Sequence, residues 1–264
     1  MIKIAVTGAC GRMGGLVIKN LIKSDDLKLV CAIDVINIGK DVGEMVGSSR
    51  LNLSIQDANH IDAILEKTQP HVLIDFTIAH AAVKNVIACV NKKIKPVVGT
   101  TGFTEEQMLL MQNAIKENGV AAVISPNFSI GVNVFWELLA KAAKHLYDYD
   151  IEIIEAHHNQ KKDAPSGTAM KAADIISKTL GLEQFVYGRH GISPRGKEIG
   201  IHAVRGGDIV GEHTVLFAGD GERIEIRHQA HSRQAFARGA IKAARWVFDA
   251  PPGIYEMRDV LGIK

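Results

Sequence analysis

Short apolar runs alternate with helix-like patterns over the first half of the chain. Apolar runs typical of buried strands lie at residues 2–7, 27–33, 71–76, 96–99 and 120–125. Patterns with apolar residues three or four positions apart, typical of helices, lie at residues 14–23, 62–67, 79–91 and 104–118. Strands that alternate with helices of about ten residues favour βαβ units and a parallel sheet. Because such crossovers are right-handed, we expect an α/β fold with an N-terminal doubly wound parallel sheet.

The second half of the chain has a different pattern. Its elements are expected in the order helix (130–146), strand (150–156), helix (169–180) and several strands (199–227). The run Gly219-Asp220-Gly221-Glu222 between two of these strands is typical of a hairpin turn. This pattern predicts a C-terminal α+β domain with a mixed or antiparallel sheet. The expected domains are therefore residues 1–126 and 127–239, with the segment 240–264 packing back on the first.

Composition and charge exclude several classes of function. The 31 basic and 29 acidic residues give a net charge of +2, which leaves no electrostatic footprint for nucleic acid or an anionic membrane. No apolar stretch reaches the roughly 18 residues that a spanning helix needs, and the N-terminus lacks the order of a signal peptide. The three cysteines, Cys10, Cys31 and Cys89, have no paired spacing. That spacing argues against a disulfide framework and predicts a cytoplasmic protein.

A glycine-rich turn follows the first predicted strand and opens the first predicted helix. Glycines permit a tight turn and a close approach of backbone N–H groups to a pyrophosphate, and a helix N-terminus attracts anions. This placement makes the first domain Rossmann-like and predicts a dinucleotide site. The spacing is G-x-x-G-x-x-G and not the commoner G-x-G-x-x-G, so a purely structural turn remains an alternative. The candidate cofactor-binding residues are Gly8, Ala9, Cys10, Gly11, Arg12 and Met13.

Asp34 ends the second predicted strand, where an acid can accept hydrogen bonds from the adenine ribose. A carboxylate there favours NADH, because it repels the 2′-phosphate of NADPH. Val35 follows and supplies no positive charge, although Arg12 or Lys40 could reach such a phosphate. A solvated aspartate without a role is the alternative. Two further strand-end loops, expected beside the nicotinamide, contribute Gly99, Thr100 and Thr101, and Ser125, Pro126, Asn127 and Phe128.

The run EAHHNQKKDAPSGTA, residues 155–169, concentrates proton-handling and anion-binding groups. His157 and Lys161 are candidate proton donors, since histidine titrates near neutral pH and lysine does so when its environment permits. Asp163 is expected to orient the lysine or the loop. The turn at residues 165–168 precedes a helix, whose N–H groups would bind a carboxylate. The sequence therefore predicts a pocket for a small di-acid, bounded by these cations and the helix N-terminus.

The same run has three other interpretations. A metal site would need a third ligand, and adjacent histidines lack the spacing of helical zinc ligands, so no metal is expected. Ser166 as a nucleophile would lack the G-x-S-x-G turn. The third interpretation is a structural loop that takes no part in any reaction. His213 and His231 are expected to be strand or surface residues.

Together these motifs resemble those of the dihydrodipicolinate reductase family, the 4-hydroxy-tetrahydrodipicolinate reductases of the diaminopimelate route to lysine. The resemblance covers essentially the whole chain, and the run H-H-x-x-K-x-D-A-P-S-G-T is its most specific part. Two departures are Ser125, where the family usually has alanine, and Val35, where many relatives have arginine. The matching runs, in family order, are VTGACGRMG, VVGTTG, SPNFSIGVN, EAHHNQKKDAPSGTA, VRGGDIVGEHTV and SRQAFARGA.

The resemblance implies a role for each matching residue. His157 is implied as proton donor or acceptor and Lys161 as proton donor, while His158, Gly167 and Thr168 are implied to bind a dicarboxylate substrate. NADH, NADPH or both are implied as cofactor, and the second domain's sheet as the interface of a homotetramer. Another NAD-dependent dehydrogenase on the same scaffold, or a non-catalytic dinucleotide sensor, are alternatives that the H-H-x-x-K run disfavours.

Overall fold

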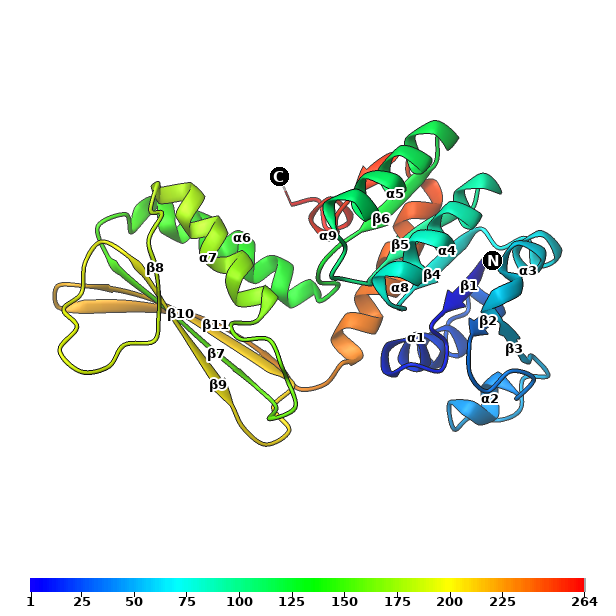
Figure 1. Cartoon of the computed structure of the whole chain (residues 1–264), viewed down its shortest axis with the longest axis horizontal. Coiled ribbons are helices and arrows are strands. Elements are labelled where there is room, and N and C mark those ends of the chain that lie inside the picture. Colours follow the sequence, from blue (N-terminus) through cyan, green and yellow to red (C-terminus); the bar gives the residue numbers. More distant parts are fainter. Residues whose placement is uncertain (264) are drawn as a thin grey trace. The chain divides into compact units, whose positions relative to one another are not determined.

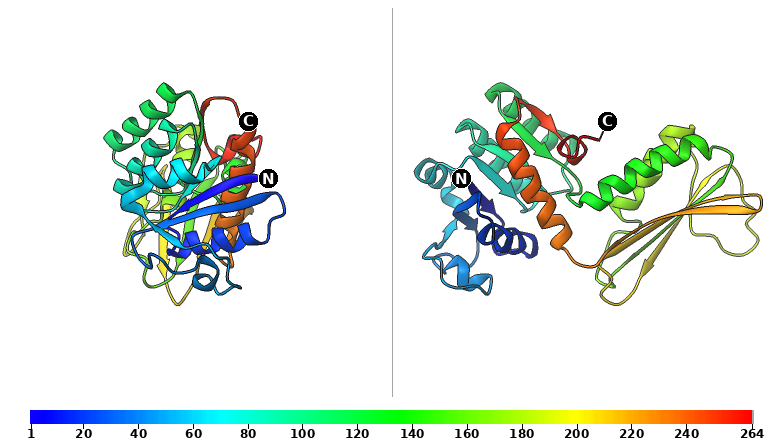
Figure 2. Two further views of the ribbon diagram at one scale, coloured as in Figure 1. Left: turned by 90° about the vertical axis from the view of Figure 1, so that its right-hand side faces the viewer. Right: turned by 180° about the vertical axis from the view of Figure 1, so that it is seen from behind.

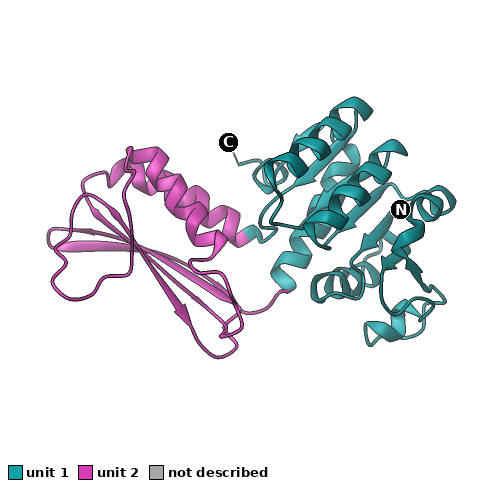
Figure 3. Cartoon of the chain, in the orientation of Figure 1, with its two compact units in different colours: residues 1–130, 234–264 teal, residues 131–233 magenta. Residues whose placement is uncertain are grey.

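The computed structural model describes residues 1–263 (Figure 1, with two further views in Figure 2), and these form two compact units (Figure 3). Unit 1 consists of residues 1–130 and the chain from residue 234 onward, and unit 2 of residues 131–233. The junctions expected from the sequence, 126 and 239, differ from these. The helix that begins at residue 234 is continuous and packs along its length in the core of unit 1, so the whole helix belongs to that unit.

Unit 1 is built on a seven-stranded sheet in which all neighbouring strands are parallel. The strand order is β12-β6-β5-β4-β1-β2-β3, which reverses at β1. Ligands of such sheets bind outside the carboxyl ends of the strands at the reversal. The predicted Rossmann-like sheet is confirmed. Its strands are β1 (Ile2–Thr7), β2 (Leu27–Asp34), β3 (Ile55–Asp57), β4 (Val72–Asp75), β5 (Lys95–Val98), β6 (Ala121–Ile124) and β12 (Gly253–Tyr255).

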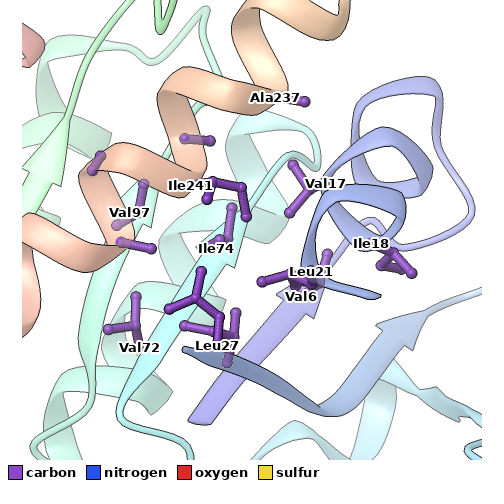
Figure 4. Packing of buried hydrophobic residues seen from close by; sticks show 14 of the residues in the cluster. Val6, Val17, Ile18, Leu21, Leu27, Val72, Ile74, Val97, Ala237 and Ile241 are labelled. Carbon is purple, nitrogen blue, oxygen red and sulfur yellow. The ribbon is translucent and has the colours of Figure 1, made fainter. Parts of the chain in front are cut away.

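Helices cover both faces of this sheet because successive strand residues point to opposite sides. Ile4 and Val6 of β1 pack with the helices of one face, and Ala5 between them packs with those of the other. Figure 4 shows the first of these cores, with Val6, Val17 and Ile241 among its side chains. The first face carries α1 (Arg12–Ile22) and α8 (Gln234–Asp249), and the second α3 (Ile61–Thr68), α4 (Ala79–Asn91) and α5 (Glu105–Asn118).

Several short elements of unit 1 are absent from the sequence-based expectation. Strands β3 and β12 have three residues each, and the short helices have three or four. A periodic pattern cannot develop over so few residues, which is why their sequences gave no signal. The short helices are α2 (Val42–Met45), the 3-10 helix η1 (Ala58–His60) and α9 (Met257–Val260).

Unit 2 contains a five-stranded mixed sheet in the order β11-β10-β7-β9-β8. Strand β10 is antiparallel to β7 and β11, whereas β7 and β8 are parallel to β9. Two helices, α6 (Ile130–His145) and α7 (Gly167–Leu180), lie on one side of this sheet (Figure 1). The predicted α+β domain with a mixed sheet is confirmed. Its strands are β7 (Asp150–His157), β8 (Phe185–Tyr187), β9 (Ile199–Arg205), β10 (Gly211–Gly219) and β11 (Glu222–Ala230).

The core of unit 2 lies between the helices and one face of the sheet. Ile153 of β7, Ile201 of β9 and Val215 of β10 are buried there with Leu139 of α6 and Ile176 of α7. The alternating residues point to the opposite face of the sheet, where no helix of this unit packs.

Among residues 1–263, none of the helices combines the length and hydrophobicity that crossing a bilayer requires.

Candidate cofactor-binding and active sites

The glycine turn after β1 has the geometry of a phosphate-binding loop. Gly8 has a φ of +71°, and a Cβ on it would lie 2.4 Å from the carbonyl oxygen of Phe76. A Cβ on Gly14 would lie 2.0 Å from the carbonyl oxygen of Gly8, so α1 packs directly against the turn. The first helical hydrogen bond runs from Gly15 N to Gly11 O at 3.0 Å, which leaves the preceding amides without partners inside the helix. The turn therefore fits a pyrophosphate.

Asp34 connects the end of β2 to this turn. Its Oδ2 accepts a hydrogen bond from Cys10 N at 2.8 Å, and its Oδ1 accepts from Val35 N at 2.7 Å and Ile36 N at 3.3 Å. The carboxylate is thus held by backbone amides and is not merely solvated. Each oxygen has two lone pairs, so Oδ2 retains the capacity to accept from a ribose hydroxyl.

A buried aspartate that the sequence reasoning missed ties three strand-end loops together. Asp75, at the end of β4, is fully buried. It accepts hydrogen bonds from the hydroxyls of Thr7 (2.7 Å), Thr77 (2.8 Å) and Thr100 (2.7 Å) and from Asn85 Nδ2 (2.8 Å). These donors come from the ends of β1, β4 and β5 and from α4. The sequence did contain a signal for Asp75, because this aspartate ends an apolar strand just as Asp34 ends β2.

The loops after β5 and β6 lie beside a cavity of about 450 Å³, lined in part by Thr100, Thr101, Ser125 and Pro126. Gly99 is required for packing, because a Cβ there would lie 2.1 Å from the ring of Phe76.

The remaining residues of the β6 loop are held in place. Ser125 Oγ donates to Asn127 O at 3.2 Å, and Asn127 Oδ1 accepts from Ser129 N at 2.8 Å. Phe128 is 2% exposed and packs in the core beside Phe76, so the structure does not place its side chain on the loop surface. The other cofactor-binding residues expected from the sequence lie at the carboxyl ends of the strands of unit 1, except Arg12 and Met13, which lie in the first turn of α1.

In unit 2, Glu155 and His157 lie on the same face of β7, two residues apart. Glu155 is fully buried, and its Oε2 lies 2.6 Å from His157 Nδ1. Both of its oxygens accept from Arg205 at 2.8 Å, and Oε1 also accepts from Ser166 N at 2.9 Å. Burial opposes ionisation, but the hydrogen bonds from His157 and Arg205 outweigh it and lower the pKa of Glu155 to about 2. Glu155 is therefore an ionised acceptor at neutral pH.

Lys161 lies in the loop beyond β7, where Asp163 orients it as expected. Lys161 Nζ lies 2.9 Å from both carboxylate oxygens of Asp163, and this contact lowers the pKa of that carboxyl. The backbone of the loop is held at two points. Lys161 N donates to His158 O at 3.1 Å, and Arg205 donates to Asp163 O at 2.7 Å. The lysine is 21% exposed, so a small ligand can reach it.

Helix α7 begins at Gly167, two residues earlier than the sequence predicted, because Ser166 is its N-cap. Ser166 Oγ accepts from Ala169 N at 3.2 Å, and the first helical bond runs from Met170 N to Ser166 O at 3.0 Å. The side chain of Ser166 is buried, which suits a cap and not a nucleophile. Gly167 and Thr168 thus lie in the first turn of a helix, where an anion is stabilised.

His213 is in a strand, β10, as expected, but it is buried and not on the surface. Its ring lies edge-on to that of His157 with centroids 5.2 Å apart, and its Nε2 lies 3.0 Å from Ser166 Oγ. Burial and the nearby His157 lower the pKa of His213 to about 3, so it is neutral near pH 7. His231 is exposed.

The structure brings His157, Lys161 and the start of α7 together through Glu155 and Arg205. Glu155 had a local signal, because residues i and i+2 of a strand share a face. Arg205 and His213 had no local signal, since they are 42 or more residues along the chain from their partners.

Within residues 1–263, no three His, Cys, Asp or Glu side chains are grouped as a metal site requires.

Comparison with known proteins assigns the chain to a family. The family described as "Dihydrodipicolinate reductase, N-terminus" matches residues 2–128, and "Dihydrodipicolinate reductase, C-terminus" matches residues 131–261. The 4-hydroxy-tetrahydrodipicolinate reductase of Methanococcoides burtonii is 60% identical over 262 residues, which cover 99% of this chain and 100% of that protein. The protein of the same name from Methanosarcina mazei is 59% identical over 263 residues, with full coverage of both.

A solved structure agrees with this assignment. The dipicolinate-bound dihydrodipicolinate reductase from Paenisporosarcina sp. TG-14 superposes with a TM-score of 0.80 and 28% sequence identity, covering 97% of each chain. Both halves of the sequence and the fold as a whole therefore match the same group of oxidoreductases. The chain belongs to the dihydrodipicolinate reductase family.

Proposed function

We propose that this protein reduces 4-hydroxy-tetrahydrodipicolinate to tetrahydrodipicolinate, with loss of water, in the diaminopimelate route to lysine. The observation that carries the proposal is the arrangement around residues 157–168. There a histidine and a lysine share a hydrogen-bonded network with the N-terminus of α7. These groups provide the cationic and N–H partners that a ring with two carboxylates needs. The names of the relatives and the dipicolinate bound to the solved neighbour support this substrate class.

Each group has a role in this proposal. One substrate carboxylate binds at Gly167 and Thr168, where the helix N-terminus stabilises it, and His158 contributes to binding. Loss of water from the hydroxylated ring carbon leaves a conjugated imine. Its reduction needs one proton at the ring, and Lys161 or His157 supplies it. A positioned proton donor of this kind typically accelerates a reaction about 10²–10⁴-fold.

The cofactor in this proposal is NADH or NADPH, with a preference for NADH. The Gly8–Met13 turn would hold the pyrophosphate, Asp34 the adenine ribose, and the loops after β5 and β6 the nicotinamide. When bound, the reduced nicotinamide supplies two electrons and a hydrogen to the ring. Val35 is 68% exposed beside Asp34 and provides no positive charge for a 2′-phosphate. That pair of residues supports the preference for NADH.

The proposed assembly is a homotetramer formed through the sheet face of unit 2 that no helix of the unit covers. Ile154 and Val204 on this face are 40% and 48% exposed, respectively. Apolar side chains grouped on an open sheet favour burial against another copy. Light scattering after size-exclusion chromatography would measure the number of subunits in the assembly.

The proposed compartment is the cytoplasm, where a reducing environment suits the three free cysteines.

A coupled turnover assay tests the proposed reaction. The unstable substrate is generated from pyruvate and aspartate semialdehyde by the preceding synthase, and NADH or NADPH oxidation is followed by absorbance. Oxidation that requires the synthase supports the reductase, and the ratio of the two rates measures cofactor preference. Oxidation with other small substrates, but not with this one, would indicate a different dehydrogenase. Cofactor binding without any turnover would indicate a dinucleotide sensor.

A further inference from the structure

Glu155 occupies a central position beneath the proposed active site. One carboxylate contacts three groups on different elements: His157, two residues along β7, the Ser166 amide at the start of α7, and Arg205 at the end of β9. Its side chain is completely inaccessible, so it cannot touch substrate. Any influence on the reaction must therefore pass through these partners.

The first consequence is a fixed tautomer for His157. An ionised carboxylate only accepts hydrogen bonds, so the 2.6 Å contact with Glu155 places a proton on His157 Nδ1. Nε2 is then the nitrogen that gains or loses a proton during a reaction. Nε2 faces the backbone of β10, since a Cβ on Gly211 would lie 3.0 Å from it. The ring is thus confined between Glu155 on one side and Gly211 on the other.

The charged and titratable groups around His157 come from every neighbouring element. Arg205 on β9 is paired with Glu155, and Lys161 is paired with Asp163 in the loop. His213 on β10 is buried and neutral. His228, opposite it on β11, has a pKa lowered by burial. Glu155 is therefore the anion that is bonded directly to the His157 ring.

The second consequence concerns the N-terminus of α7. Glu155 Oε1 accepts the Ser166 amide at 2.9 Å, and Ser166 Oγ caps the helix. Arg205 links the same carboxylate to the Asp163 carbonyl of the Lys161 loop. The position of the helix start, where the substrate carboxylate would bind, is thus set by the residue that also holds His157.

We propose that Glu155 is a positioning residue, which fixes His157 with its proton on Nδ1 and holds the start of α7 for the substrate carboxylate. The inference rests on the proposed reductase function. It assigns to a single buried carboxylate the alignment of the proton-transfer group and the anion-binding group, and it predicts that both are disturbed together when that carboxylate is lost.

Glu155→Gln is the primary test. The introduced amide can donate to Nδ1, which moves the His157 proton to Nε2, and the ¹⁵N spectrum of histidine-labelled protein records this change directly. His157→Asn identifies the signal. We expect kcat to fall about 10²-fold or more, by analogy with loss of a positioned proton-transfer group. We also expect KM for the substrate to rise and the Kd for NADH to stay unchanged. Glu155→Asp, which keeps the charge, should recover part of kcat.

Two matched controls separate positioning from folding. Glu198→Gln removes another buried, arginine-paired glutamate of the same unit, with no contact to His157. Gly211→Ala presses on the His157 ring from the opposite side, whereas a Cβ at Gly206 meets nothing within 4 Å. Glu198→Gln and Gly206→Ala should keep the wild-type tautomer and kcat, and Gly211→Ala should lower kcat without changing NADH binding.

The outcomes are distinct. An unchanged His157 tautomer in Glu155→Gln, or equal losses of kcat in Glu155→Gln and Glu198→Gln, would overturn the positioning role. If Glu155→Gln fails to fold, an unaltered kcat in Gly211→Ala would overturn it instead. A wild-type protein without turnover, but with the His157 proton on Nδ1, would refute the proposed reaction while leaving the hydrogen-bond assignment intact.

Discussion

Neighbouring glycines at positions 14 and 15 provide a matched test of the cofactor site. Both lie in the first turns of α1. A Cβ on Gly14 would lie 2.0 Å from Gly8 O, about 1.4 Å inside the 3.4 Å at which ordinary contacts begin. A Cβ on Gly15 would meet nothing closer than 3.9 Å. Gly14→Ala must therefore push α1 and the phosphate-binding turn apart, whereas Gly15→Ala leaves them in place.

The displacement should weaken dinucleotide binding by a calculable amount. A hydrogen bond to a charged group contributes about 1.5–3 kcal/mol, so loss of one phosphate–amide bond raises Kd about 10- to 150-fold. Gly15→Ala should leave Kd unchanged and stabilise the helix by about 0.5–1 kcal/mol. Titration of NADH fluorescence measures Kd, and thermal melting confirms the fold. A folded Gly14→Ala protein that binds NADH as tightly as Gly15→Ala would refute the assignment of this turn.

The remaining predictions concern the proton donor, cofactor choice and acid stability. Lys161→Ala should lower kcat about 10²–10⁴-fold while NADH binding stays near normal, and steady-state kinetics with NADH titration would reveal unchanged turnover if the lysine is not the donor. Val35→Arg should raise kcat/KM for NADPH relative to NADH, and an unaltered ratio would contradict the proposed ribose site. Because folding lowers the pKa of Glu155 from 4.5 to about 2, its stabilisation is complete above pH 4.5 and is lost as pH falls towards 2. Urea unfolding should therefore show the stability gap between wild type and Glu155→Gln narrowing over that range, and a gap independent of pH would argue against it.

The sequence predicted those parts of the fold whose signals are local. Apolar strands alternating with helices are enough to define the parallel sheet of unit 1, and the glycine turn and Asp34 identify its ligand-binding edge. Strands β3 and β12 escaped prediction because three residues carry no period. The predicted domain junctions, at residues 126 and 239, lie a few residues from the unit boundaries at 130 and 234. They differ because only packing decides which unit a connecting segment joins.

The candidate site was predicted in outline, without its supporting interactions. His157, Lys161 and the start of α7 are contiguous in sequence, so their association was visible. Arg205 and His213 reach this cluster from other strands of the sheet, and no spacing rule connects them to it. Strand register, which is set by the packed core, brings them together.

Isotope labelling of the transferred hydrogen reports directly on the proposed reduction. The coupled reaction is run with NADH deuterated at the transferable position of the nicotinamide, and the ring product is analysed by mass spectrometry. If the protein is the proposed reductase, the tetrahydrodipicolinate formed carries a single deuterium from the cofactor, at the ring carbon that lost the hydroxyl. Synthase-dependent product without cofactor-derived deuterium, or cofactor oxidation without this product, would show that the protein does not catalyse the proposed reduction.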